Sequence, residues 1–598
     1  MYLYEYVAFY LKSRSVDLVF TITGAGDVRM IEALRRQGID YVCPHHEQAG
    51  VMASLARYRL SGRPAVTMVT GGPGATNTIS GIADAYLDSI PCIIIAGQER
   101  SDFMQPSDTL RGKGIQGLQM VQITTPLVKY AHCVMNPHDI RAVLDEAFHQ
   151  AFSGRPGPVW VEIPQDLQNI DINPETLRGF TPPPPKVDMP KMRAAAEETL
   201  RLLQGAQRPL LWVGHGIRLG GAEEQFRAIF DRLGVPALVS WNGADLVPDD
   251  HPLFVGRAGT YGQRWANLAV QNCDALICLG TRLAIPQRGY VDSEFARAAK
   301  KVVVEIDPDE LNKLKCRVDV AVLGDVKDFL LVLGEALSAS NLPARDFSGW
   351  SAHCAAWREK YPMSQPQHAS DSPINSYNFI DRLSDLLDKD DVIVTDMGTS
   401  LTCTHAGIRL KTGQRLVTST GLGEMGYGLP GAIGASLGAP DRRVILIAGE
   451  GSLMMNLQEF QTAVHLKLPL KIILLNNNGY LTIKHTHRAL FGESDPPATA
   501  PNTGVSFPDF ARIAAVFGFS HARIDDPSQI DKGVTDFLAT PGPAILEVMM
   551  AENQLLIPKA AIKVRPDGSM YSPPLEDMFP FLPEGELKRE MIIPTLDK

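Results

Sequence analysis

Two segments in the last third of the chain decide the fold: Val444-Ile-Leu-Ile-Ala-Gly-Glu-Gly-Ser452 and Lys471-Ile-Ile-Leu-Leu-Asn-Asn-Asn-Gly-Tyr480. Each is a mostly apolar run that ends in glycine and small polar residues. The stretch between the two runs carries apolar residues at helical spacing, namely Leu457, Phe460, Val464 and Leu468. Continuous apolar strands that alternate with helices indicate a parallel sheet covered on both faces. The segment is therefore predicted to be a strand–helix–strand unit, and ligands bind such sheets beyond the carboxyl ends of the strands.

The polar residues at these two strand ends suit a metal ion and a phosphate. Glu450 and Asn477 stand 27 residues apart, about one strand–helix–strand unit, so both are expected at the same edge of the sheet. A carboxylate oxygen, a carboxamide oxygen and a nearby backbone carbonyl are ligands that Mg²⁺ accepts. The glycines let backbone N–H groups approach phosphate oxygens at the start of a helix. A Gly-x-Gly run before a helix is equally typical of a tight turn, so the pattern alone leaves both interpretations open.

The same alternation of strand and helix patterns fills the rest of the chain. Further predicted strands cover residues 18–22, 65–70, 91–96, 209–213, 275–279, 301–306, 391–395 and 544–549. Two stretches are predicted to be linkers, 181–190 with four consecutive prolines and 342–373 rich in Ser, Pro, His and Gln. They divide the chain into three domains, each an α/β doubly wound parallel sheet, over residues 1–180, 191–341 and 374–550, with a tail over 551–598.

The composition excludes several classes of function. Of the 598 residues, 45% are apolar and 21% are charged, as in an ordinary globular protein. The net charge of −10 argues against a nucleic-acid or anionic-membrane partner, because such partners require a basic patch. The eight cysteines include no Cys-x-x-Cys pair, which disfavours a zinc site and is typical of reduced thiols. With no signal-peptide pattern and no apolar run of bilayer length, we expect a cytoplasmic protein.

The run from Gly449 to Asn477 resembles a known coenzyme signature, in which Gly-Asp-Gly is followed at this spacing by Asn-Asn. That signature belongs to the family of enzymes that depend on thiamine diphosphate (ThDP). The resemblance implies Mg²⁺ ligands from the Glu450 carboxylate, the Asn477 side chain and the backbone oxygen of Gly479. It implies further coenzyme contacts from Gly449, Gly451, Ser452, Tyr480 and Leu481. Glu450 stands where the family usually has Asp, so the loop must absorb one extra methylene.

Two segments upstream resemble other parts of the same coenzyme site. Thr420-Gly-Leu-Gly-Glu-Met-Gly-Tyr-Gly-Leu-Pro430 resembles the run that holds the aminopyrimidine ring. The resemblance implies that the carbonyl of Gly423 accepts from the 4′-amino group and that Met425 forces the coenzyme into a bent shape. An isolated methionine is more often a core residue, but the surrounding glycines favour the coenzyme role. Asp396-Met-Gly-Thr-Ser400 resembles the loop over the diphosphate, with contacts from Gly398, Thr399 and Ser400.

The first domain resembles the part of the family that supplies a catalytic glutamate. In Pro44-His-His-Glu-Gln-Ala-Gly50 the matching residue is Glu47, which would bond to N1′ of the pyrimidine. On its own, this glutamate would be interpreted as a solvated helix residue. Thr70-Gly-Gly-Pro-Gly-Ala-Thr-Asn77 resembles the family's Gly-Pro-Gly loop beside the coenzyme and implies contacts from Gly72, Pro73 and Asn77.

Three more residues of the first domain are candidates for contact with substrate. Gln116 aligns with a family glutamine that faces the substrate, and Gly24 stands where the family places a backbone donor to the substrate oxygens. His46 is a candidate proton carrier by residue type. A histidine near a pocket is more often structural, so His485 and His487 are left out of the predicted site.

The middle domain gives a weaker signal. Gly214-His-Gly216 follows a predicted strand in a pattern loosely similar to a dinucleotide fingerprint, without an acidic residue at a convincing distance. The domain resembles the central domain of the family, which binds FAD in some members. Those members usually show Arg-Phe and then acidic residues, whereas this chain has Arg282-Leu-Ala-Ile285. ThDP and Mg²⁺ are therefore the expected cofactors, with FAD as a disfavoured third.

In their order along residues 1–550, these motifs most resemble acetohydroxyacid synthase and its relatives. The resemblance implies a ThDP- and Mg²⁺-dependent carboligase that decarboxylates a 2-keto acid, with pyruvate as donor, and adds the product to a carbonyl acceptor. Leu481-Thr-Ile-Lys-His-Thr486 and Pro164-Gln-Asp166 depart from the synthase pattern and predict a different acceptor. The family also implies a homodimer or homotetramer in which Glu47 of one subunit meets the diphosphate loop of another.

Two other functions stay open at this point. The same coenzyme supports a simple decarboxylase, a C–C lyase or a hydrolase that forms no new carbon–carbon bond. A non-catalytic regulatory paralogue is the alternative from another class, and the retention of Glu47 speaks against it.

Overall fold

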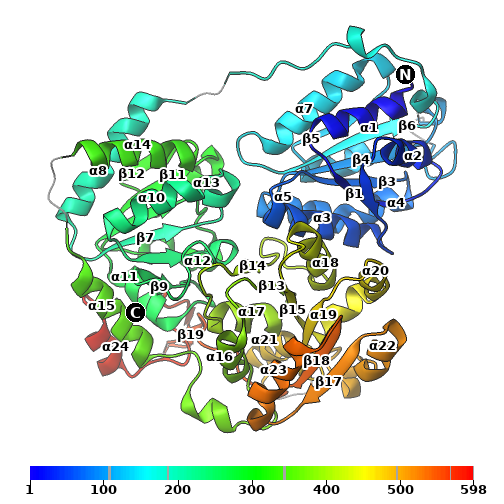
Figure 1. Cartoon of the computed structure of the whole chain (residues 1–598). Helices are drawn as coiled ribbons and strands as arrows, with labels where there is room; N and C mark the ends of the chain where they lie inside the picture. Colours follow the sequence, from blue (N-terminus) through cyan, green and yellow to red (C-terminus); the bar gives the residue numbers. More distant parts are fainter. Residues whose placement is uncertain (105–109, 185–186, 341–344, 493–495, 566, 597–598) are drawn as a thin grey trace.

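Three six-stranded parallel sheets dominate the molecule, as the computed structural model shows (Figure 1). The structure describes residues 1–598 except 105–109, 185–186, 341–344, 493–495, 566 and 597–598. One residue of the predicted proline run, Pro185, and the predicted domain boundary at 341 lie outside the described residues. Helices separate the strands along the chain, which confirms the predicted α/β fold class.

The first sheet has the strand order β2-β1-β3-β4-β6-β5. Its strands are β1 (Leu18–Ile22), β2 (Asp40–Val42), β3 (Ala65–Val69), β4 (Cys92–Gln98), β5 (Tyr130–Cys133) and β6 (Pro158–Pro164). Its helices are α1 (Leu3–Ser13), α2 (Val28–Arg36), α3 (Glu47–Ser61), α4 (Pro73–Asn77), α5 (Ile79–Asp88), α6 (Met120–Thr124) and α7 (Ile140–Phe152). Along β4, Ile93 and Ile95 join one apolar cluster while Ile94 joins another, so both faces of this sheet are covered.

The third sheet repeats that topology with the order β14-β13-β15-β16-β18-β17. Its strands are β13 (Val392–Thr395), β14 (Arg415–Val417), β15 (Val444–Gly449), β16 (Lys471–Asn476), β17 (Ser520–Ile524) and β18 (Ala544–Met549). Its helices are α16 (Ser376–Leu386), α17 (Thr399–Gly407), α18 (Gly428–Gly438), α19 (Glu450–Leu453), α20 (Glu459–His465), α21 (Leu481–Phe491), α22 (Phe510–Phe517) and α23 (Ile530–Ala539). The first and third domains therefore present equivalent strand ends, and each contributes one part of the predicted site.

The middle sheet differs, with the order β12-β11-β10-β7-β8-β9. Its strands are β7 (Pro209–Val213), β8 (Ala237–Val239), β9 (Phe254–Gly256), β10 (Ala275–Leu279), β11 (Lys300–Glu305) and β12 (Val320–Leu323). Its helices are α8 (Met189–Gly205), α9 (Gly216–Leu219), α10 (Glu223–Leu233), α11 (Arg264–Asn272), α12 (Ile285–Arg288), α13 (Pro308–Asn312), α14 (Val326–Ala339) and α15 (Ser348–Lys360). This is the strand order of a dinucleotide-binding sheet. The chain builds the sheet outward from β7 in one direction and then outward from β10 in the other, so the topological switch point lies between β7 and β10.

Helices α3 and α18 pack closely and join the first domain to the third (Figure 1). A Cβ on Gly434 would lie 1.9 Å from the carbonyl oxygen of Ala53, and one on Gly438 would lie 2.9 Å from that of Arg57. The contacts advance in the same direction along both helices, so the two helices run parallel. Their N-termini, at Glu47 and Gly428, therefore lie at the same end of the interface.

Replacing Gly434 by alanine is expected to lower the free energy of unfolding by about 3 kcal/mol, because the backbone of α3 must move to admit a methyl group. Gly205 is a matched control at the end of a helix, since nothing lies within 4 Å of the position that its methyl group would take. Chemical denaturation of both variants measures the difference. Equal stability of Gly434→Ala and Gly205→Ala would show that the α3–α18 contact is not close packed.

The predicted second linker contains a packed helix, α15, so the interpretation of residues 348–360 as a linker is corrected. Helix α15 buries Trp350, Cys354 and Trp357, at helical spacing, against the middle domain. The residues after Met550 also return to this domain and form strands β19 (Lys563–Val564) and β20 (Met570–Tyr571) and helix α24 (Glu584–Glu590) (Figure 1). Their side chains are held there by contacts such as Gln271 to Glu576 (2.6 Å) and Trp357 to Glu590 (2.6 Å).

Among the described residues, no helix combines the length and the apolar character that crossing a bilayer requires.

Candidate active site

The predicted metal ligands meet where β15 and β16 end. Glu450 is the first residue of α19 and is only 1% exposed. Its Oε1 accepts a hydrogen bond from the backbone N–H of Gly479 (2.7 Å), and its Oε2 accepts one from the N–H of Asn477 (3.4 Å). The extra methylene of Glu450 is therefore accommodated by a turn that folds back over the carboxylate.

The side chain of Asn477 completes this group. One of its two terminal amide atoms, which is either the oxygen or the nitrogen, lies 3.2 Å from Oε1 of Glu450 and 2.5 Å from the carbonyl oxygen of Gly479. If that atom is nitrogen, it donates to both oxygens; if it is oxygen, three acceptors face one another with no hydrogen between them. Three converging oxygens of these types fit a hard cation such as Mg²⁺, so the residues present suit the implied metal.

Burial sets the charge state of this carboxyl group. Removal from water raises the pKa of Glu450 to about 7, although the N–H groups of Gly479 and Asn477 and the charge of Lys484 lower it. A bound cation would restore the carboxylate form, because its positive charge offsets the loss of hydration. The Nζ of Lys484 lies 2.9 Å from the position of a Cβ on Gly479, so this lysine stands beside the predicted metal ligands.

Two glycines around the predicted metal ligands, Gly398 and Gly449, border open space. Gly398 has φ +95° and precedes α17, and nothing lies within 4 Å of its Cβ position. Gly449 also faces open space, whereas a Cβ on Gly451 would lie 2.1 Å from the ring of Tyr480. Tyr480 thus packs directly on the Gly449–Gly451 turn, and Leu481 beside it is buried at the start of α21.

The loop after β13 lies against these residues. The hydroxyl of Thr399 accepts a hydrogen bond from Asn477 (3.4 Å), and Ser452 donates to the carbonyl of Met397 (3.0 Å). Ser400 donates to the carbonyl of Asp396 (2.8 Å), which holds the loop in its turn. The three loops that begin at 396, 449 and 476 therefore form one continuous cradle.

Asp396 joins this cradle to the segment predicted to hold the pyrimidine, and it was not among the predicted contacts. Its carboxylate accepts from the backbone N–H groups of Met397 (2.7 Å), Gly426 (3.0 Å) and Gly428 (3.0 Å). Burial raises its pKa to about 6. The connection places Gly423 and Met425 beside the loop that begins at Asp396, since a Cβ on Gly423 would lie 2.6 Å from Cε of Met397.

Glu47 lies at the start of α3 against the predicted Gly-Pro-Gly loop. It is 9% exposed, and its Oε2 accepts a hydrogen bond from the side chain of Asn77 (2.9 Å). Its Oε1 would lie 3.3 Å from a Cβ on Gly74. No hydrogen bond or ion pair among the described residues links Glu47 to the cradle of the same chain.

Gln116 and the Gly72–Pro73 turn lie together beside the loop that holds Glu47. Gly72 has φ +65°, which admits the sharp turn into Pro73, and its Cβ position is 2.5 Å from Cβ of Gln116. Gln116 is exposed.

Gly24 and His46 are engaged differently from their predicted roles. The N–H of Gly24 already donates to Oδ1 of Asp27 (2.7 Å), and Nδ1 of His46 accepts from the N–H of Gln48 (3.2 Å) as a helix cap. Asp27, which was not predicted from the sequence, is fully buried and its Oδ2 has no partner among the described residues. Burial raises the pKa of Asp27 to about 7, with a smaller contribution from the charge of Glu47.

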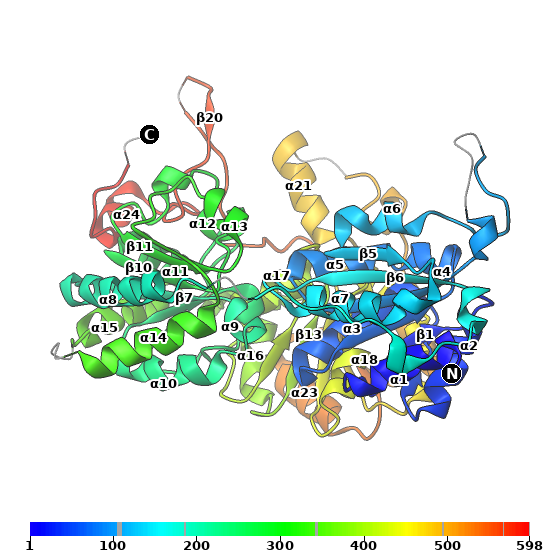
Figure 2. The ribbon, with the colours of Figure 1, turned by 90° about the horizontal axis from the view of Figure 1, so that it is seen from above.

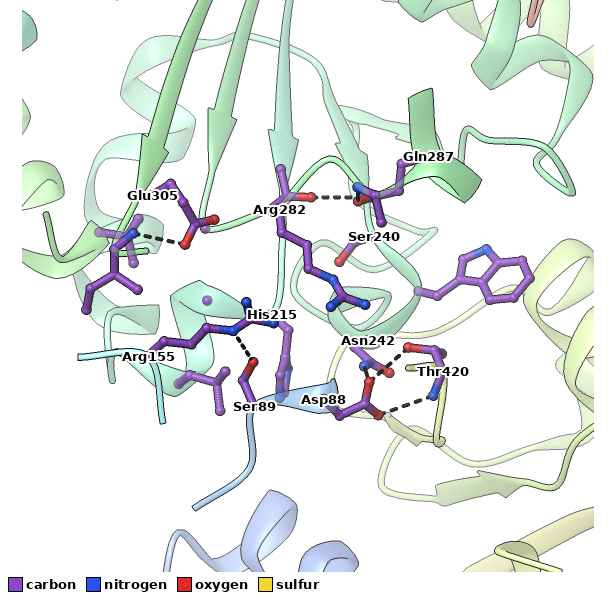
Figure 3. A pocket seen from close by; sticks show the side chains of 18 of the residues that line it. Asp88, Ser89, Arg155, His215, Ser240, Asn242, Arg282, Gln287, Glu305 and Thr420 are labelled. Atoms are coloured by element: carbon purple, nitrogen blue, oxygen red, sulfur yellow. Dashed lines mark hydrogen bonds between the residues drawn. The ribbon is translucent and has the colours of Figure 1, made fainter. Parts of the chain in front are cut away.

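A cavity of about 450 Å³ opens at the carboxyl ends of the middle sheet, between the three domains (Figure 3). Arg282 points into it and has no ion pair with a described residue, whereas Arg155 pairs with Asp307 (3.1 Å) and Glu310 (2.7 Å). Glu305 turns its Oε1 back onto the N–H of Ile306 (2.9 Å). Two arginines, Arg155 and Arg282, and three carboxyl side chains, Asp88, Glu305 and Asp325, line the cavity, which lies apart from the predicted metal ligands.

Three family models match the chain, and each is described as a domain of the thiamine pyrophosphate enzymes. The N-terminal TPP binding domain matches residues 1–123, the central domain matches residues 196–333, and the C-terminal TPP binding domain matches residues 396–548. Each match falls on one of the three sheets.

Curated relatives match over nearly the whole chain. The acetolactate synthase isozyme 2 large subunit of Escherichia coli (strain K12) is 32% identical over 592 residues, which cover 98% of either chain. The isozyme 1 large subunit of the same organism is 33% identical over 93% of this chain and 95% of its own. Acetolactate synthase 2, chloroplastic, of Nicotiana tabacum is 32% identical over 92% of this chain and 82% of its own.

Proposed function

The chain belongs to the thiamine pyrophosphate enzyme family, and on that premise we propose that it is a carboligase that decarboxylates a 2-keto acid, with pyruvate as donor. It joins the remaining acyl unit to a second carbonyl compound. The observation that carries the proposal is the meeting of Glu450, Asn477 and the Gly479 carbonyl beside an open glycine cradle. That set fits a metal-bridged diphosphate.

The chain's own residues bind and orient the coenzyme in this proposal. When bound, ThDP supplies a nucleophilic carbon and an electron sink for the loss of CO₂. Glu450, Asn477 and the carbonyl of Gly479 would hold Mg²⁺, and Gly398, Thr399 and Ser452 would border the diphosphate. Gly423 and Met425 would contact the pyrimidine from one side, because Asp396 ties their segment to the cradle.

Glu47 would act on the opposite edge of the pyrimidine. Asn77 fixes one carboxylate oxygen, so the other is free to hold a proton on the ring nitrogen. The helix cap from His46 fixes the first turn of α3, which carries Glu47, and the absence of a side chain at Gly74 leaves room for Oε1 of Glu47. Among the described residues, uncharged contacts alone therefore position the Glu47 carboxylate.

We propose that the complete site forms between two copies of the chain. Exposed apolar side chains flank both halves: Ile115 and Leu118 beside Gln116, and Leu422, Met454, Met455, Ile483, Leu490 and Phe491 beside the cradle. Helix α21, which carries three of them, stands out from the body (Figure 2). Apolar patches of this kind mark protein interfaces, so a homodimer or homotetramer is expected.

The acceptor is proposed to differ from that of the curated relatives. Helix α21 begins at the cradle and carries Lys484 and the buried His485 where the synthase pattern has other residues. Burial lowers the pKa of His485 to about 4, so this ring is neutral near pH 7. A neutral ring and one lysine offer a different contact surface to the acceptor.

FAD is not part of the proposed reaction. The acidic residues that flavin-binding members show after the arginine are absent from Arg282-Leu-Ala-Ile285. We therefore expect ThDP and Mg²⁺ to suffice.

The experiment is product analysis of the purified protein with labelled pyruvate and a panel of aldehydes, ketones and 2-keto acids. We expect CO₂ release and a new carbon–carbon bonded product that both require ThDP and Mg²⁺. Added FAD should change the rate less than about twofold. Failure to turn over any 2-keto acid in the presence of both cofactors would contradict the proposal.

A simple decarboxylase is the second candidate, and Asp27 is the observation that favours it. A buried carboxyl group with an unpaired oxygen and a pKa raised to about 7 is suited to deliver a proton near neutral pH. Protonation of the acyl unit would then compete with its addition to an acceptor. An aldehyde as sole product, with every acceptor present, would favour this alternative.

A further inference from the structure

A buried group of carboxyl side chains joins α5 to the segment 419–426, which lies directly before α18. Asp84 on α5 is 0% exposed, and Glu424 stands between the two predicted coenzyme contacts Gly423 and Met425. Neither carboxyl group belongs to the metal ligands or to the predicted coenzyme contacts. The two residues come from different domains and face each other across Ser419.

The hydroxyl of Ser419 determines how many protons Asp84 and Glu424 must hold. Its Oγ lies 2.8 Å from Oδ1 of Asp84 and 2.8 Å from Oε2 of Glu424. A hydroxyl has one hydrogen to donate, so it can satisfy only one of two carboxylates. The other carboxyl group must carry a proton of its own to make a hydrogen bond. The remaining oxygens, Oδ2 of Asp84 and Oε1 of Glu424, are buried and have no partner among the described residues.

The charges around the pair cannot neutralise two carboxylates. Arg59 is the cation that faces the pair in the described part of the chain. It already forms an ion pair of 2.6 Å with Asp88, which is a third acidic group. Asp88 also accepts from Asn242 (2.9 Å) and from the N–H groups of Thr420 (3.2 Å) and Gly421 (2.9 Å) (Figure 3). Tyr427 also faces the pair and is uncharged near pH 7, because burial raises its pKa far above its usual range.

We propose that Asp84 and Glu424 hold one proton between them beside Ser419, and that this protonated pair fastens the segment 419–426 to α5. Asp88 fastens the start of the same segment through Thr420 and Gly421. Asp84 and Glu424 are positioning residues, because they act on the coenzyme only through Gly423 and Met425. The inference rests on the proposed function only for the identity of the ligand that this segment contacts.

The pair makes coenzyme binding sensitive to alkaline pH. Burial, and then the charge of the neighbouring carboxylate, raises the pKa of Asp84 to about 7 and that of Glu424 to about 9. A raised folded-state pKa means that the stabilising proton is bound at lower pH and is lost as pH rises through that pKa. Above about pH 9, the carboxylates of Asp84, Asp88 and Glu424 would share the single positive charge of Arg59, and their repulsion would push the segment 419–426 away from α5.

The test compares the pH dependence of ThDP binding in the wild-type protein, Glu424→Gln and the exposed-surface control Glu224→Gln. Calorimetric titration with ThDP and Mg²⁺ needs no turnover, so it is independent of the substrate. We expect the wild-type dissociation constant to rise by about tenfold per pH unit above about pH 9, and Glu224→Gln to behave in the same way. Glutamine cannot lose a proton, so Glu424→Gln should show less than about threefold change over that range.

An identical alkaline rise in the wild-type protein and Glu424→Gln would overturn the proposal. If ThDP binds to no variant at any pH, the proposed function fails instead. A second measurement uses whichever of Asp84→Asn and Glu424→Gln folds: the wild-type-minus-variant infrared difference spectrum of the ligand-free protein at about pH 7 should contain a protonated carboxyl band, beyond the signal of Asp27 and Glu450 that both proteins share. Absence of that difference band contradicts the shared proton directly.

Discussion

Replacing Glu47 by glutamine is expected to lower kcat about 10²–10⁴-fold while the affinity for ThDP changes less than about threefold. Glutamine has nearly the same shape and can still accept from Asn77, which donates to this side chain over 2.9 Å. It cannot hold a proton on the pyrimidine, so the coenzyme would bind but would not be activated. Rates of CO₂ release from pyruvate, together with calorimetric ThDP titration, separate the two effects.

Glu459 offers a matched control for this substitution. It is also a buried carboxylate, and it accepts from the backbone N–H of His45 (3.0 Å), two residues before Glu47. Glu459→Gln keeps an acceptor at that position and lies outside the site, so kcat should stay within about threefold of the wild-type value. Equal losses in Glu47→Gln and Glu459→Gln would mean that the effect comes from disturbed packing of the Pro44–Glu47 turn.

Replacing Glu450 by glutamine is expected to raise the Mg²⁺ concentration for half-maximal ThDP binding by about 100-fold or more, because the metal loses the one carboxylate among its proposed ligands. Glu450→Asp restores the residue type usual in the family but shortens the side chain. Since Oε1 of Glu450 accepts from Gly479 over 2.7 Å, aspartate should lose that contact and weaken Mg²⁺ binding by about tenfold.

The order of affinities, wild type above Glu450→Asp above Glu450→Gln, is the result to measure by Mg²⁺ titration of coenzyme binding. Removal of Mg²⁺ by a chelator should release ThDP from the wild-type protein, and added Mg²⁺ should restore binding. Wild-type affinity in Glu450→Gln would contradict the assignment of this carboxylate as a ligand. A higher affinity in Glu450→Asp would show that the turn over Glu450 is strained.

The sequence predicts the inner strands well because their signal is local. Strands β1, β7, β10 and β18 match the predicted ranges to the residue, since each is a short apolar run that is largely buried. The edge strands, which are short or partly exposed, were missed, and so were two buried inner strands, β6 and β8. The edge strand β17, for example, has only Ile524 buried, so it carries no apolar run to detect.

The part of the site that follows motif spacing was also predictable. Glu450 and Asn477 meet because one strand–helix–strand unit separates them, and Asn77 meets Glu47 at the ends of neighbouring elements. The contacts of Asp27, Asp396 and Glu459 were not predicted. An aspartate that accepts backbone N–H groups looks like any surface aspartate in a sequence, and the bond from His45 to Glu459 spans 414 residues.

The sequence of helix α15 contains a helical pattern, but the composition around it favoured a linker. Trp350, Cys354 and Trp357 follow helical spacing, yet the surrounding Ser, His, Pro and Gln residues favoured a linker. The carboxyl pair of Asp84 and Glu424 carries no sequence signal at all. Its chemistry depends on the packing of two domains, which only the three-dimensional structure provides.

The most direct test of the central claim, that Glu47 of one copy serves the cradle of another, is complementation between two inactive variants. Glu47→Gln and Glu450→Gln chains are co-expressed, and the rate of the mixture is compared with each variant alone. A mixed dimer then has one site with both wild-type residues, so the mixture should regain about one quarter of wild-type activity. A mixture no more active than its parents would contradict a site shared between subunits.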